Sequence, residues 1–149
     1  MRIFYAASST SHDCLQQSTL WYDNLYRPLV DLGHEVVDSG YDFRPFNFNL
    51  DPSVPEQAEF IRTHRPRASE MLLERVRAAH REKPIDLFFS YFYSAHVEPA
   101  VIRAIRDMGI VTINWYCNAS YQFDLVKEIA SAFDYCLVPE KFRLEDYRR

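Results

Sequence analysis

The chain lacks any long apolar segment. Its 149 residues include no run of about 18 apolar side chains, the length that a membrane-spanning helix requires. The first residues, Met1 and Arg2, lead directly into a short strand-like stretch, without the extended apolar region of a secretory signal. We therefore expect a cytoplasmic protein with no membrane span.

An excess of positive charge is also missing. The 17 lysine and arginine side chains are outnumbered by 21 aspartate and glutamate side chains, so the formal net charge is −4. A protein that binds nucleic acid through its phosphates needs a clustered excess of cations. We expect no nucleic-acid partner.

Cysteines are few, and their spacing suits neither a disulfide framework nor a zinc site. The three are Cys14, Cys117 and Cys136, and none forms a CxxC pair. Cys136 is expected in the core. His12, Asp13 and Cys14 are adjacent in sequence, and adjacent residues rarely converge on one ion. We predict no metal site.

Sequence motifs of several common α/β proteins are absent as well. The loop after the first predicted strand has no glycine, whereas a dinucleotide site needs glycines for a tight turn and close approach to the pyrophosphate. No GxSxG motif of a serine hydrolase occurs. Residues 90–94 lack the aspartate that a receiver domain would phosphorylate. We expect no NAD, FAD or other cofactor.

The chain does contain a regular alternation of strand-like and helix-like segments. Strands are predicted at 2–7, 34–38, 85–92, 110–116 and 135–138, and helices at 18–32, 55–82, 97–108, 123–133 and 140–148. Gly33 should end the first helix, Pro66 should divide residues 55–82 into two helical pieces, and residues 39–55 should form a long loop.

This alternation predicts an α/β fold. Strands that alternate with helices favour a parallel sheet covered on both faces, with right-handed crossovers. We expect one three-layer, doubly wound, Rossmann-like domain over residues 1–149, with the strand order 3-2-1-4-5. Ligands should then bind in the loops beyond the carboxyl ends of the strands.

Three such loops carry polar and aromatic groups. After the first strand, Ser9, Thr10 and Ser11 offer hydroxyl groups that would either cap the next helix or contact an anion or a sugar. After the third strand, residues 91–96 combine aromatic rings, hydroxyl groups and one imidazole. This composition suits carbohydrate or nucleotide-like ligands.

The residues predicted to bind substrate in the other two loops are Tyr91, Tyr93 and Ser94, together with Trp115 and Asn118 after the fourth strand. His96 is either a base or part of the cap of the helix that begins near residue 97. Cys117 has no partner at a spacing that would identify it as a nucleophile.

The last third of the chain, GIVTINWYCNASYQFDLVKEIASAFDYCLVPEKFRLEDYR, resembles the CgeB-like (spore maturation) glycosyltransferases of the two-domain GT-B class. The similarity is sharpest over residues 87–147, in the segments FDYCLVPEKF and DYRR. It implies an N-terminal, acceptor-side domain that needs a C-terminal donor-binding domain or partner subunit to transfer a sugar. The isolated domain would be inactive.

The resemblance also implies that the acceptor hydroxyl needs a base, which in several inverting GT-B enzymes lies near the first strand. His12 and Asp13 are the candidates there, and His96 is a third. Where the relatives tend to have acidic residues, this chain has Cys117 and Asn118, so only a hydrogen-bonding role carries over to Asn118.

Two other classes of protein remain open. One is a non-enzymatic, flavodoxin-like module that binds a ligand or a partner at the same strand ends. The other is a small independent enzyme, such as a hydrolase that uses His12 or His96 with Asp13.

Overall fold

The protein is built around one sheet of five parallel strands. The computed structural model describes residues 1–7, 21–40, 50–118 and 120–148. Its strands are β1 (Arg2–Ala6), β2 (Glu35–Asp38), β3 (Leu87–Ser90), β4 (Val111–Trp115) and β5 (Tyr135–Leu137). Every neighbouring pair runs parallel, which confirms the predicted α/β class.

The strands follow the order β2-β1-β3-β4-β5, so the predicted order 3-2-1-4-5 is wrong. β3 lies in the interior of the sheet because it has apolar side chains for both faces, and Phe88 and Phe89 are buried on opposite sides. β2 lies at an edge and begins and ends with the exposed Glu35 and Asp38. The strand order therefore reverses between β1 and β3, and ligands of such sheets bind at this reversal.

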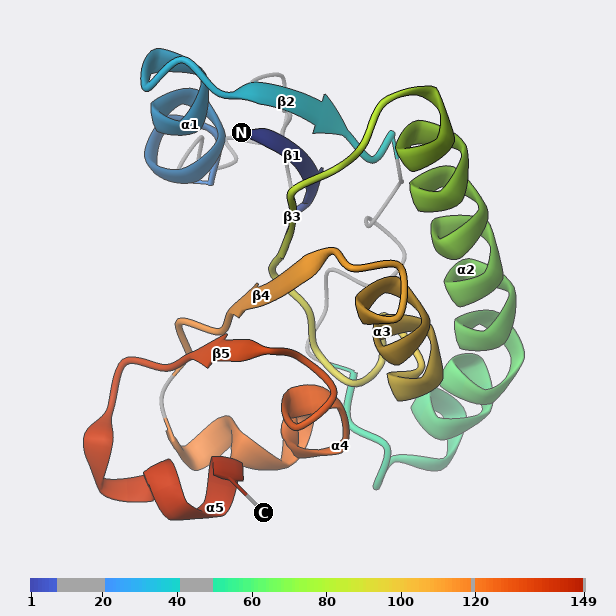
Figure 1. Ribbon diagram of the computed structural model, residues 1–149. Helices are drawn as coiled ribbons and strands as arrows, with labels where there is room; N and C mark the ends of the chain where they lie inside the picture. Colours follow the sequence, from blue (N-terminus) through green and yellow to red (C-terminus); the bar gives the residue numbers. More distant parts are fainter. Residues whose placement is uncertain (8–20, 41–49, 119, 149) are drawn as a thin grey trace.

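Helices cover both faces of the sheet, as predicted. The π-helical turn η1 (Tyr22–Tyr26) and α1 (Arg27–Asp31) lie on one side, and α2 (Pro55–Glu82), α3 (Pro99–Arg106) and α4 (Lys127–Ala130) lie on the other (Figure 1). Side chains alternate along β1, so Ile3 and Tyr5 pack beneath η1 and α1, whereas Phe4 and Ala6 face α2 and α3. Gly33 follows α1 with φ at 80°, which confirms its predicted role as the residue that ends the helix.

The face covered by η1 and α1 is open over β4 and β5 in the described part of the chain. Val111 and Trp115 of β4 are 43% and 37% exposed, and Tyr135 and Leu137 of β5 are 58% and 42% exposed. Register pairs Trp115 with Leu137. Parallel sheets are normally covered on both faces. On this face, the described helices leave the apolar side chains of β4 and β5 uncovered.

The prediction that Pro66 divides residues 55–82 into two pieces is wrong, because α2 is one continuous helix of 28 residues. Proline removes the hydrogen bond to the carbonyl of Arg62, four residues earlier. Both Arg62 and Pro66 are exposed, so water can bind that carbonyl. Buried residues on either side, Ile61 and Leu72 among them, hold the helix against the body of the protein.

The predicted helices at 123–133 and 140–148 are each replaced by two short pieces. A 3-10 helix, η3 (Ser120–Leu125), precedes α4, and another, η4 (Lys141–Arg143), precedes α5 (Leu144–Arg148). Across the described ranges, no helix combines the length and the apolar character needed to cross a membrane.

Candidate functional site

Asn114 joins the carboxyl ends of β3 and β4. Its side chain is fully buried, and its Oδ1 accepts hydrogen bonds from the Phe92 N–H at 2.8 Å and from Ser90 Oγ at 3.0 Å. Its Nδ2 donates to the Phe92 carbonyl at 3.1 Å. One amide therefore satisfies both backbone groups of Phe92, where the chain leaves β3. Asn114 is not among the predicted site residues, although an amide within the apolar run 110–116 indicates a strand that bonds to a neighbour.

Beyond this joint, three side chains form a closed ring of hydrogen bonds. The Tyr91 hydroxyl donates to Asn118 Oδ1 at 3.0 Å, and Asn118 Nδ2 donates to the Tyr93 hydroxyl. The two phenol oxygens are 3.0 Å apart. Because a phenol has one proton and Tyr91 uses its own on Asn118, Tyr93 donates to Tyr91. The ring unites predicted site residues from two loops.

Aromatic rings surround this polar group. Trp21, just before η1, contacts the Tyr91 ring with 4.7 Å between centroids. Tyr93 packs edge to face against Tyr116 at 5.6 Å and against His96 at 5.3 Å. All three members of the hydrogen-bond ring are partly buried.

His96 is buried and forms part of a tight turn. The imidazole Nδ1 of His96 accepts a hydrogen bond from the Tyr93 backbone N–H at 2.9 Å, and the backbone N–H of His96 donates to the Tyr93 carbonyl at 3.0 Å. Nδ1 therefore carries no proton. The structure gives His96 a positioning role for Tyr93, and its use as a base stays a prediction.

Ser94 anchors the same loop through its backbone. Its N–H donates to the Leu125 carbonyl at 2.7 Å, and its carbonyl accepts from Arg65 at 3.1 Å. Arg65 also pairs with Glu128 at 2.8 Å. The buried Oγ of Ser94 has no hydrogen-bond partner in the described structure.

Trp115 lies on the open face of the sheet, and its surroundings include Tyr116, whose ring also contacts Tyr93. With Leu137 and Pro139 it lines an apolar hollow of about 140 Å³ beyond the ends of β4 and β5. Cys136 packs against the core, as expected, and burial raises the pKa of its thiol to about 11. It is therefore a poor nucleophile near neutral pH.

The remaining predicted residues, Ser9, Thr10, Ser11, His12 and Asp13, lie outside the described residues. Their roles as ligand contacts or as the base stay predictions. In the ranges that are described, no group of three or more His, Cys, Asp or Glu residues is placed to hold a metal ion.

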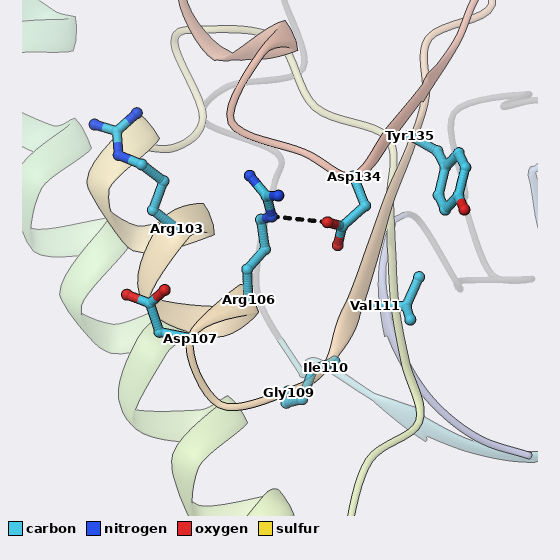
Figure 2. A pocket seen from close by; sticks show the side chains of 8 residues that line it. All are labelled: Arg103, Arg106, Asp107, Gly109, Ile110, Val111, Asp134 and Tyr135. Carbon is cyan, nitrogen blue, oxygen red and sulfur yellow. Dashed lines mark hydrogen bonds and ion pairs between the residues drawn. The ribbon is translucent and has the colours of Figure 1, made fainter.

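A larger open hollow, of about 570 Å³, lies at the opposite, amino-terminal ends of β4 and β5. In Figure 2, Arg106 reaches from α3 across to Asp134, and their closest atoms are 2.8 Å apart. Asp134 also accepts the Thr112 N–H at 2.9 Å and the Thr112 hydroxyl at 3.0 Å. Arg106 and Asp134 therefore neutralise each other. The hollow also lies at the edge of the sheet opposite to the loops where parallel sheets bind ligands. We assign it a structural role.

This network should make stability sensitive to acid. Burial raises the pKa of the Asp134 carboxyl, but hydrogen bonds from Thr112 and the Arg106 charge outweigh burial and hold the pKa below its ordinary value. The unfolded chain then binds more protons, so the contribution is complete above about pH 4, the pKa of an unfolded aspartate. It is lost as the pH falls through the folded pKa.

We expect Asp134→Asn to flatten the loss of unfolding free energy below about pH 4, as measured by urea denaturation at several pH values. Thr112→Val removes the hydroxyl that donates to the Asp134 carboxyl and accepts from the Asp134 N–H, and it should raise the Asp134 pKa in an NMR titration. An unchanged acid slope in Asp134→Asn would show that this carboxyl contributes nothing.

Comparison with known protein families, curated proteins and solved structures found no match. The candidate site is therefore defined by its own geometry. It offers hydroxyl and amide groups beside aromatic rings, on a buried support, at the edge where parallel sheets bind ligands.

Proposed function

We propose that this chain is the acceptor-side domain of a GT-B glycosyltransferase, and that it binds a hydroxyl-bearing acceptor at the carboxyl ends of β3 and β4. The observation that carries the proposal is the ring of Tyr91, Tyr93 and Asn118 beside Trp21. Aromatic rings pack against the C–H faces of a sugar, and paired hydroxyl and amide groups bind its oxygens.

The parallel sheet supports this proposal, because its strand order places the loop after β3 at the reversal between β1 and β3. The nucleotide of the donor would bind to a C-terminal domain or partner subunit, and transfer would require both halves. His12, Asp13 and His96 are the proposed candidates for the base that removes the proton of the acceptor hydroxyl. A cytoplasmic location likewise remains a prediction of the sequence.

A titration followed by NMR tests this function. The full chain labelled with ¹⁵N is titrated with a panel of neutral and charged saccharides, and separately with UDP-glucose. We expect a saccharide to shift the amide signals of Tyr91, Tyr93 and Asn118, while UDP-glucose leaves them in place. Tight binding of UDP-glucose to these residues would overturn the acceptor-side assignment.

A second candidate function is a non-enzymatic ligand-binding module. The observation that favours it is the bond from the Tyr93 N–H to His96 Nδ1, which occupies the nitrogen that a base would use. If the full enzyme can be assembled with a donor domain, His96→Gln separates the two functions. A module would keep saccharide binding in a protein that has no transferase activity with or without the substitution.

A further inference from the structure

The ring of Tyr91, Tyr93 and Asn118 has limited bonding capacity left for a ligand. The three phenol and amide hydrogens that close the ring are used internally. What remains is a lone pair on each phenol oxygen, because the Asn118 amide also forms a hydrogen bond to the phenol of Tyr116. The ring therefore accepts hydrogen bonds from a ligand more readily than it donates them.

In the described part of the chain, the groups that act on the phenols of this site are uncharged. Burial is the main cause that raises the pKa of Tyr91, followed by its hydrogen bond to Tyr93 and by the proximity of Tyr93 and Cys117. Burial also raises the pKa of Tyr116, with smaller effects of Tyr93, Tyr147 and Cys136. The main causes of both shifts are therefore burial and neighbouring phenol, thiol and amide groups.

The described cation that contacts the loop after β3 is already paired. Arg65, whose guanidinium reaches the Ser94 carbonyl, is paired with Glu128.

A phosphate or carboxylate needs a cation or several N–H donors when it leaves water, because an unpaired charge is costly to bury. A ring whose N–H and O–H groups already have partners does not meet that need. A sugar hydroxyl is a better match, since it carries no charge and donates to a phenol lone pair. The chemistry of the ring thus excludes anions and admits polyols.

We propose that the site of Tyr91, Tyr93 and Asn118 selects an uncharged, hydroxyl-rich ligand, such as a neutral sugar unit, and rejects the phosphorylated form of the same molecule. The inference rests on the proposed function, which leaves the charge of the acceptor open. It adds the substrate class.

Matched pairs of ligands test the selectivity. Glucose, galactose and N-acetylglucosamine are each titrated into the ¹⁵N-labelled full chain beside their own 6-phosphates. We expect a neutral member to shift the amide signals of the three ring residues and its 6-phosphate to bind more weakly by roughly tenfold or more. Equal or tighter binding of the phosphorylated member would overturn the selectivity and leave the acceptor-side function standing. If no sugar or sugar phosphate shifts these signals, both proposals fail.

Two substitutions check that the ring itself makes the contact. Tyr91→Phe and Tyr93→Phe each remove one hydroxyl and should weaken binding of the neutral sugar by roughly fivefold or more. Tyr135→Phe is the matched control, because this phenol is exposed on the open face of the sheet. Wild-type affinity in both ring variants would contradict the proposal.

Discussion

Replacing Asn114 with leucine should lower the free energy of unfolding by about 3 kcal/mol, because a buried polar group that loses its partner costs about 1–3 kcal/mol. The substitution removes the acceptor of the Phe92 N–H and the donor to the Phe92 carbonyl together. It also removes the acceptor of Ser90 Oγ. Urea denaturation of the variant and the wild type measures the difference.

The same substitution at Asn24 is the control, because Asn24 is exposed on η1 and its effect should stay within about 0.5 kcal/mol. Asn114→Leu should also move the amide signals of Tyr91 and Tyr93, since Asn114 holds the residue between them. A loss of less than about 1 kcal/mol would contradict the role assigned to this amide.

Arg2→Met should lower the free energy of unfolding by about 3 kcal/mol, since hydrogen bonds from a charged donor contribute about 1.5–3 kcal/mol each. The guanidinium is buried and donates to the carbonyls of Ala79 and Lys83, the first at 2.6 Å. It also pairs with Glu35 at 2.8 Å. One side chain therefore joins β1, the start of β2 and the end of α2.

Arg62→Met provides a matched control, because Arg62 also pairs with a glutamate but is 74% exposed. Exposed pairs contribute about 0–1 kcal/mol, so this variant should stay close to the wild type. NMR adds a second measurement. Hydrogen bonds from Lys83 and Arg2 hold the pKa of Glu35 below its ordinary value, and Arg2→Met should raise it. Equal destabilisation by the two arginine variants would contradict a special role for Arg2.

The strand order is a feature of the fold that was predicted incorrectly from the sequence. Periodicity predicts each strand, but it does not identify the neighbours of the third one. The buried pairs Phe4 with Phe88 and Tyr5 with Phe89, whose rings are 5.9 Å and 5.7 Å apart, place β3 beside β1. A strand with large apolar side chains on both faces belongs in the interior of a parallel sheet, and this signal was available in residues 85–92.

The candidate site was located only in part. The loops after the third and fourth strands were predicted, and they contribute Tyr91, Tyr93 and Asn118 to one ring. The ring itself was not foreseen, because it joins residues 27 positions apart in the sequence. The burial of His96 was not predicted either, because its hydrogen bond to the Tyr93 N–H depends on a local turn.

The sequence by itself determined the five strands, the glycine that ends α1 and the polar character of the loops at the carboxyl edge. These features depend on side-chain periodicity and backbone preference, which act over a few neighbouring residues. Tertiary structure decided the strand order, the continuity of α2 through Pro66 and the joint made by Asn114. Each of these depends on which distant segments pack together, because burial and the need to pair buried polar groups act across the whole fold.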